Sequence, residues 1–363
     1  LRTGTLSGTG AIRADGGGRI YHHLGGGGRI AIELNTPGAT FASYTGPITA
    51  YGGNGNANRG AAGTIYLRAY GVATNDGVLI VDNGPVVSTR HTLMHANVAG
   101  KLVGEVQIRN NGRIKVPAGQ VLQVSRVWTN AAAAGYGLTG DVGGTVEFVD
   151  NTVTTRLWGA TTYRRFECDT PGKALQFAPG STTDVDEAWV VQGAGGSPIT
   201  LRSTSNDAPW RLTVDAGANQ TVDYVDVRDS DASAPGATIS ALHSTDSGSN
   251  LNWSFTVTGL NNIWNGNSST VWGVPGNWSL GRAPIPEDNV TIATGCPRYP
   301  TLDAHRTMQD LTIESGASLT LGGWNLTVEG NLDVAGALQA TTNENVVLRG
   351  TNVIFTGGIL GRA

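Results

Sequence analysis

Apolar residues recur along the chain at a long and regular interval. Ile12, Ile30, Ile48 and Ile65 follow one another at a spacing of about 18 residues, and each begins or lies in a short apolar stretch beside a glycine cluster. Within these stretches apolar and polar residues alternate, which is the period of a β-strand with one buried face. Such an interval is too long for a helix and predicts one turn of a β-solenoid, with like residues stacked on like.

Two motifs alternate in residues 1–70. Residues 10–14 are echoed by residues 47–50, and residues 28–34 are echoed by residues 63–69. Glycine runs lie between the motifs and can supply the positive-φ corners that join one strand to the next.

The clearest periodicity lies in residues 311–363. The ladders with a common spacing of about 21 residues are Leu311–Leu332–Val353, Ile313–Val334–Phe355 and Leu338–Ile359, and Leu326 and Val328 reach Val346 and Leu348 at nearly the same spacing. Three short strands per turn of about 20–21 residues predict a three-sided parallel β-helix. No segment of ten or more residues has an apolar period of 3.6, so helix should be scarce, with residues 131–134 the one helix-like spot.

These patterns predict an all-β fold, a parallel β-helix with about 18–21 residues per turn in two or three consecutive stacks. We expect four segments: a Gly-rich β-solenoid at 1–157, a β-helix repeat module at 158–257, a Trp- and Pro-rich linker or cap at 258–288, and a three-sided β-solenoid at 289–363. A cap is expected because an open solenoid end exposes a sheet edge.

Composition fits this architecture and excludes several functions. Glycine accounts for 53 of 363 residues and charged residues for 14%, which favours many tight turns between short strands. With 6 Phe and 2 Met, the core should consist of Val, Ile, Leu, Ala and Thr. The net charge of −4 comes without a basic run, which disfavours nucleic acid. The sequence contains no stretch of 18 apolar residues, so it does not predict a membrane-spanning helix.

Several stretches resemble a known class of proteins. Residues 177–183 (FAPGSTT), 197–203 (SPITLRS), 222–233 (VDYVDVRDSDAS) and 250–255 (NLNWSF) resemble modules of giant bacterial surface proteins of the parallel β-helix type. Residues 272–292 are similar to the opening of β-helical passenger domains in autotransporter-like and adhesin-like proteins. The resemblance covers most of the chain and implies a secreted, cell-surface location, but it carries no catalytic residues.

The densest acidic cluster comprises Asp223, Asp226, Asp229 and Asp231, and a second acidic group, Asp184, Asp186 and Glu187, precedes it. Stacked carboxylates can bind Ca²⁺, the one cofactor that the sequence suggests, or act as acid and base on a polysaccharide. However, Asp223 and Asp226 are an odd number of residues apart and should point to opposite faces of a strand unless a bulge intervenes. A solvated face or a turn is therefore the preferred interpretation.

Four tryptophans, Trp264, Trp272, Trp278 and Trp324, could form a platform on which sugar rings stack. The preferred alternative is that they seal the solenoid cap. N-x-S/T sequons, which are glycosylation signals in some secreted proteins, begin at Asn219, Asn252, Asn267, Asn277, Asn289 and Asn325.

Other candidates are weaker. His22 and His23 are adjacent and would point in opposite directions in a strand, and a zinc site at His91 and His95 would need a helix where a strand is expected. The glycine runs at 25–28 and 52–60 lack the Lys-Ser/Thr ending of a phosphate loop, and Asn54, Asn56 and Asn58 are expected to fill turns. Cys168 and Cys296 should not form a disulfide, because six turns at about 4.8 Å separate them by roughly 30 Å.

The resulting hypothesis is an extracellular structural or adhesive β-solenoid segment without catalysis. Its expected partners are further copies joined end to end, or other surface proteins. A carbohydrate-binding module using the tryptophans is the alternative. A polysaccharide lyase or hydrolase using Asp226, Arg228 and Asp231 is a more distant one. The chain begins inside a Gly-rich motif without a signal peptide, so we expect a mature or partial segment of a larger secreted protein.

Overall fold

The fold is that of a parallel β-solenoid. The computed structural model describes residues 1–17, 24–55, 59–94, 102–256, 259–350, 352–356 and 361–362. Within these residues helix is limited to two short 3-10 turns, η1 (Phe41–Ser43) and η2 (Pro275–Asn277). The strands are mostly parallel and stack into about 12 turns, which confirms the predicted fold class.

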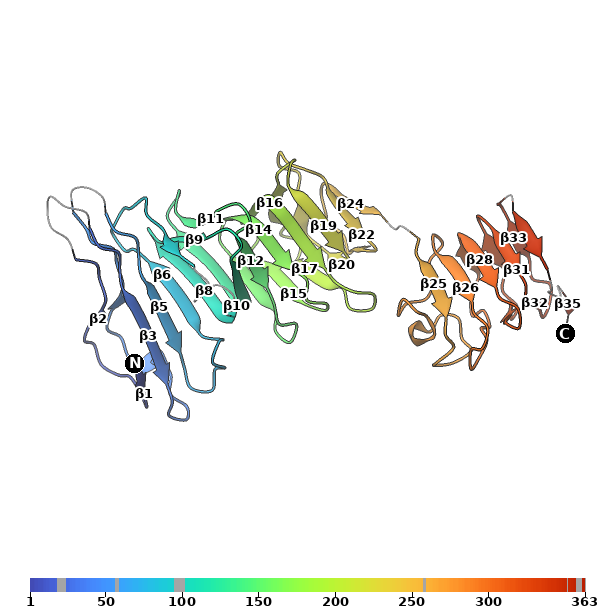
Figure 1. The fold of residues 1–363 in the computed structure, drawn as a ribbon, viewed down its shortest axis with the longest axis horizontal. Coiled ribbons are helices and arrows are strands. Elements are labelled where there is room, and N and C mark those ends of the chain that lie inside the picture. The colour runs from blue at the N-terminus through green and yellow to red at the C-terminus, as the bar shows by residue number, and fades with distance from the viewer. Residues whose placement is uncertain are drawn as a thin grey trace. The chain divides into compact units, whose positions relative to one another are not determined.

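The chain divides into two compact units, Leu1–Phe255 and Thr256–Ala363 (Figure 1). The strands of residues 1–256 are β1 (Arg2–Thr3), β2 (Ile12–Arg13), β3 (Arg29–Leu34), β4 (Ile48–Thr49), β5 (Thr64–Arg68), β6 (Val78–Asp82), β7 (Thr92–Leu93), β8 (Leu102–Asn110), β9 (Arg113–Val116), β10 (Val121–Ala132), β11 (Gly137–Gly140), β12 (Thr145–Phe148), β13 (Thr155–Trp158), β14 (Thr161–Cys168), β15 (Ala174–Phe177), β16 (Thr182–Gln192), β17 (Ile199–Ser203), β18 (Trp210–Val214), β19 (Asn219–Asp223), β20 (Val225–Val227), β21 (Ser230–Asp231), β22 (Ile239–Leu242), β23 (Thr245–Asp246) and β24 (Trp253–Thr256). The finer division of the chain into four segments stays a prediction.

The isoleucine ladder has a different meaning from the one predicted. Ile12 of β2 pairs with Ile48 of β4, and Ile30 of β3 pairs with Ile65 of β5, so pairing partners lie about two expected intervals apart. The predicted turn length is therefore wrong for this block. Each turn has two strands, in two separate sheets, and their two ladders interleave in the sequence. The alternating motifs at 10–14 and 28–34 pair with their own echoes, as their similarity indicates.

The sheet of the first unit reverses direction between β5 and β6. These strands pair antiparallel, with Leu67 opposite Val78, whereas β6 pairs parallel with β8. No turn signal in the sequence predicted this reversal, because both strands read as ordinary solenoid strands.

The reversal moves the core to the other face of the sheet. Ile65 and Ile80 pack in a cluster with the first turns, while Leu79 and Val81 belong to the long core of the following turns. Because side chains alternate between the faces of a strand, β6 contributes to both cores. The face that carries Ile80 is therefore the interior of the first turns and the exterior of the later ones.

A column of aromatic side chains fills the core of the later turns. Phe166 lies 4.5 Å from Trp189 between ring centroids, and Phe177 stacks on Trp210 at 3.9 Å. The expectation of a purely aliphatic core is thus wrong here. Few aromatic residues are needed, because the solenoid places those of successive turns on top of one another. Residues 131–134, the one helix-like spot in the sequence, are not helical. The first two form the end of strand β10, and the other two follow it.

The second unit has three sides, as predicted. Its strands are β25 (Asn261–Trp264), β26 (Asn289–Ile292), β27 (Arg306–Met308), β28 (Asp310–Ile313), β29 (Ser318–Thr320), β30 (Leu326–Val328), β31 (Leu332–Val334), β32 (Ala337–Ala340), β33 (Val346–Leu348), β34 (Val353–Phe355) and β35 (Gly361–Arg362). They form three separate parallel sheets. Leu311 pairs with Leu332 and Leu332 with Val353, which confirms this predicted ladder. Ile359 lies outside the described residues.

Candidate functional site

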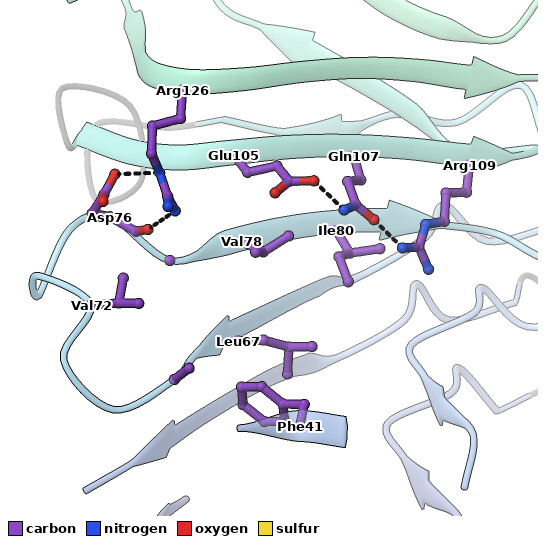
Figure 2. Close-up of a pocket in the computed structure, with 12 residues that line it drawn as sticks. Phe41, Leu67, Val72, Asp76, Val78, Ile80, Glu105, Gln107, Arg109 and Arg126 are labelled. Carbon is purple, nitrogen blue, oxygen red and sulfur yellow. Dashed lines mark hydrogen bonds and ion pairs between the residues drawn. The ribbon is translucent and has the colours of Figure 1, made fainter. Parts of the chain in front are cut away.

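A groove opens where the sheet reverses direction (Figure 2). Its volume is about 350 Å³, and it lies over the face of the sheet that changes from interior to exterior. Residues from η1, β5, β6, β8 and β10 line it, so it joins segments that are far apart in the sequence.

One wall of the groove is apolar. Leu67 from β5 and Val78 and Ile80 from β6 belong to the core cluster of the first turns or pack against it, and Phe41 from η1 and Val72 complete the wall. These side chains would be covered by a further turn in a regular solenoid. Here the antiparallel pairing places a polar strand beside them instead.

The other wall is a row of polar side chains on β8. Glu105, Gln107 and Arg109 are alternate residues and therefore share one face of the strand. The Gln107 amide donates to the Glu105 carboxylate, and Arg109 donates to the Gln107 carbonyl (Figure 2). The three side chains thus hold one another in place along the groove.

An ion pair closes one end of the groove. Arg126 Nε lies 3.2 Å from Asp76 Oδ1, and Arg126 Nη2 donates to the Asp76 main-chain oxygen at 2.6 Å. The Ser125 hydroxyl also donates to Asp76 at 2.8 Å. Chemically, the groove offers apolar surface on one side and alternating acceptor, amide and donor groups on the other.

The acidic cluster does not come together as a site. Asp226 pairs with Arg202 at 2.5 Å, while Asp223 contacts His243 Nδ1 at 2.8 Å. Asp231 accepts hydrogen bonds from Ser233, which hold the pKa of its carboxyl below the usual range.

Asp229 is only 2% exposed and lies between β20 and β21 with a positive φ of 56°. Tyr224 also has a positive φ, of 47°, and forms a corner between β19 and β20. This corner interrupts the strand and leaves both Asp223 and Asp226 half-exposed, so the argument from strand parity does not apply here.

Among the residues that the structure describes, no three His, Cys, Asp or Glu side chains are grouped closely enough to hold a metal ion. The candidate calcium site stays a prediction. In the suggested catalytic set, Arg228 forms ion pairs with Asp207 at 3.0 Å and with Asp229 at 3.5 Å, and Asp226 pairs with Arg202.

The earlier acidic group has its own environment. Burial, together with the carboxylates of Asp186 and Asp215, raises the pKa of Asp184. Asp186 pairs with Arg164 at 3.2 Å, and Glu187 accepts a hydrogen bond from the Gly143 amide at 2.8 Å.

Three of the four candidate tryptophans are buried. Trp264 and Trp272 are 0% exposed and Trp278 is 2% exposed, and Trp278 contacts both of the others edge to face. A sugar ring cannot reach these faces, so the four-residue platform is wrong. The three rings belong to the core of the second unit. Trp324 is 37% exposed and lies edge-on to His305.

Other candidates are placed as follows. His22, His23, His95, Asn56 and Asn58 lie outside the described residues. His91 is half-buried, and burial together with Arg113 and Lys115 lowers its pKa.

The sequons differ in their surroundings. Asn277 is fully buried with its amide bonded to Ser269 and Val271, so it cannot carry a glycan in this fold. The exposed sequon asparagines are Asn219, Asn252 and Asn267, and Asn289 and Asn325 are half-buried.

The structure contains a buried lysine that the sequence pattern did not reveal. Lys173 is 0% exposed, and its Nζ donates to the carbonyl oxygens of Ser125, Asp150 and Val153 at 2.7–2.8 Å. The Ser125 carbonyl is available because the register of β10 shifts between Val124 and Val127. In the sequence Lys173 follows Pro-Gly and reads as an ordinary turn residue.

Burial lowers the pKa of Lys173 to about 8. Cys168 lies close by, and burial raises the pKa of its thiol to about 12. Both Cys168 and Cys296 are free, and they belong to different units.

Comparison with known proteins finds no matching family model, no similar curated protein and no similar solved structure. The resemblance to bacterial surface modules therefore stays a prediction based on the quoted stretches. Across the described residues, no helix has both the length and the apolar character needed to cross a membrane.

Proposed function

We propose that this chain is a structural segment of a larger extracellular surface protein, in which the β-solenoid serves as a stiff and protease-resistant scaffold. One observation carries the proposal. Nineteen strands of the first unit are linked into one continuous sheet, in which strands pair with those of the turns before and after. Dense main-chain hydrogen bonding of this kind leaves few backbone groups free to open toward a protease.

Charged side chains on the outer surface also link successive turns. Arg202 of β17 pairs with Asp226 of β20, and Arg68 of β5 pairs with Glu33 of β3. Such partly solvated surface pairs are each worth only about 0–1 kcal/mol. The stiffness therefore comes mainly from the strand ladders and the stacked core.

The surface location is tested on intact cells of the source organism. Antibodies against the chain should label intact cells as strongly as permeabilised cells, and external protease should release few fragments from the two units. Labelling that appears only after permeabilisation would overturn the extracellular role. Rapid cleavage within the paired strands would overturn the scaffold role.

The proposal includes association end to end. Val353, Ile354 and Phe355 of β34 are 41–50% exposed, although Val353 and Phe355 continue the core ladder of the second unit. In a larger protein, either the next turn of the same chain or the end of a second copy would cover this apolar strand. Sedimentation should show concentration-dependent association that Ile354→Lys weakens, and a strictly monomeric chain at high concentration would exclude this part.

Carbohydrate binding is the second candidate, and it now depends on Trp324. This ring is exposed beside His305 in a turn closed by Gly322 and Gly323. Glycan-array binding should be lost in Trp324→Ala and retained in Trp158→Ala, whose ring is 40% exposed in the first unit. Equal binding by both variants would remove this candidate.

A further inference from the structure

We propose that the contact between β12 and β14 is a pH-sensitive device, which tightens in acid and loosens as the pH rises. Three carboxylates carry the inference: Glu147 on β12, Glu167 on β14, and Asp169 just after β14. We call them the acidic seam. The inference rests on where these groups lie between successive turns, and it does not depend on the scaffold role.

Glu147 lies between side chains of the two neighbouring turns. It is paired in register with Gln123 of β10 on one side and with Glu167 of β14 on the other. Adjacent strands are about 4.8 Å apart, so the two glutamates meet at close range. Like charges directly opposite each other destabilise a sheet. The stacking of these turns is therefore weakest when both glutamates are ionised.

The neighbouring cation does not neutralise Glu147. The guanidinium of Arg165 bonds to Glu167 through Nε at 3.1 Å and Nη2 at 2.7 Å, and its Nη1 lies 4.0 Å from Glu187. Across the described part of the chain, neither Glu147 nor Asp169 has an ion-pair partner within 4.0 Å. Glu147 thus faces two carboxylates, of which only that of Glu167 is paired with a cation.

The surroundings favour the protonated form of Glu147. Burial and the nearby carboxylates of Asp169 and Glu167 raise its pKa above the ordinary value of 4.5, against the opposing effect of the hydrogen bond from Gln123 at 2.8 Å. A protonated Glu147 can also donate to Asp169, which lies within hydrogen-bonding reach. The adjacent Cys168 thiol stays neutral, because burial raises its pKa to about 12.

The direction of the pH response follows from this raised pKa. The folded chain holds the proton of Glu147 more tightly than the unfolded chain does. The resulting stabilisation is therefore complete below 4.5, the ordinary value, and is lost as the pH rises through the higher value of the folded state. Above that value Glu147 is charged and repels both Glu167 and Asp169, and the contact between the turns weakens.

The test compares native-state hydrogen exchange of the full chain with that of Glu147→Gln at about pH 4 and about pH 7. Glutamine keeps the shape of the protonated side chain but cannot ionise. In the parent, the protection factors of the β12 and β14 amides should fall as the pH rises. In the variant they should stay constant, and at the higher pH they should exceed the parent values about two- to fivefold. Lys173, with a pKa of about 8, stays charged over this range.

Two further variants separate the seam from other sources of pH dependence. Asp169→Asn removes one repelling charge and should reduce the fall without abolishing it, because Glu167 remains. Glu105→Gln is the matched control, because Glu105 is in register with Val78 and Val127 and has no carboxylate opposite. It should leave the protection of β12 and β14 unchanged at both pH values.

Protection that stays constant or rises with pH in the parent would overturn the proposal. A fall as steep in Glu147→Gln as in the parent would also overturn it, because the response would then come from other groups, such as Asp184 on β16 with its raised pKa. Circular dichroism verifies that each variant is folded.

Discussion

Lys173→Met removes the ammonium group that three main-chain carbonyls share, while keeping a side chain of similar length. Each hydrogen bond from a charged donor contributes about 1.5–3 kcal/mol, so three contribute roughly 4–9 kcal/mol. Against this stands the cost of keeping the charge buried. The pKa falls from 10.5 to about 8, which corresponds to about 3 kcal/mol. The free energy of the three hydrogen bonds exceeds the cost of burying the charge, so we expect the variant to lose about 3 kcal/mol of stability.

Native-state hydrogen exchange measures this loss locally. The amides of β10, β14 and β15, which surround Lys173, should exchange faster in the variant, while those of the second unit should not change. Lys115→Met is the matched control, because Lys115 forms an exposed pair with Asp141 at 2.5 Å worth at most about 1 kcal/mol. A loss below about 1 kcal/mol for Lys173→Met would refute the carbonyl-binding role.

The same residue predicts a pH dependence. Because the folded-state pKa is below the unfolded value, the unfolded chain binds more protons between about pH 8 and 10.5. Stability should therefore rise with pH across this window as the buried ammonium deprotonates. The difference in stability between the parent and Lys173→Met should grow over the same range. A constant difference would contradict the assigned pKa shift.

Three further substitutions or reactions test the cores of the two units. Asp288→Ala leaves the charge of Arg282, bound at 2.5 and 2.8 Å, without its buried partner and should cost about 3–5 kcal/mol in urea unfolding. Trp210→Ala removes the ring stacked on Phe177 and should cost about 3–5 kcal/mol. In mass-spectrometric alkylation of the folded chain, half-buried Cys296 should react well before Cys168, whose burial raises its pKa to about 12.

Matched controls make these outcomes decisive. Glu329→Ala breaks an exposed pair with Arg349 and should cost less than about 1 kcal/mol. Trp158→Ala removes a ring that is 40% exposed and should cost far less than the buried substitution. Equal losses within either pair would contradict the assignment of burial, and equal alkylation of the two thiols would contradict the placement of Cys168 in the core.

Much of the second unit was predictable because its turns are nearly equal in length. With this nearly constant period, Leu311, Leu332 and Val353 line up in the sequence as they do in space. The first unit lacks this property. Its insertions at corners change the turn length, so the step along the chain from Val106 to its partner Trp128 is much shorter than the step from Ala188 to Asn219.

The candidate sites were less predictable, because exposure depends on contacts between turns. Trp272 and Trp278 read equally well as a sugar platform or a seal, and their mutual packing decides for the seal. The groove was missed altogether. Its polar row on β8 reads as the ordinary outer face of a strand, and nothing in the sequence places Phe41 opposite it.

By itself the sequence determined the alternation of buried and exposed positions within each strand, and hence the class of fold. Around Ile12, Ile30, Ile48 and Ile65 apolar residues alternate with polar ones, which requires strands with one buried face. The glycine-rich segments between these strands favour tight corners, and therefore a coiled stack. Only the tertiary structure decided which strands are neighbours. The pairing of Ile12 with Ile48, the antiparallel contact of β5 with β6 and the burial of Lys173 all join residues distant in sequence. Such contacts depend on the summed packing of whole turns, which no local pattern records.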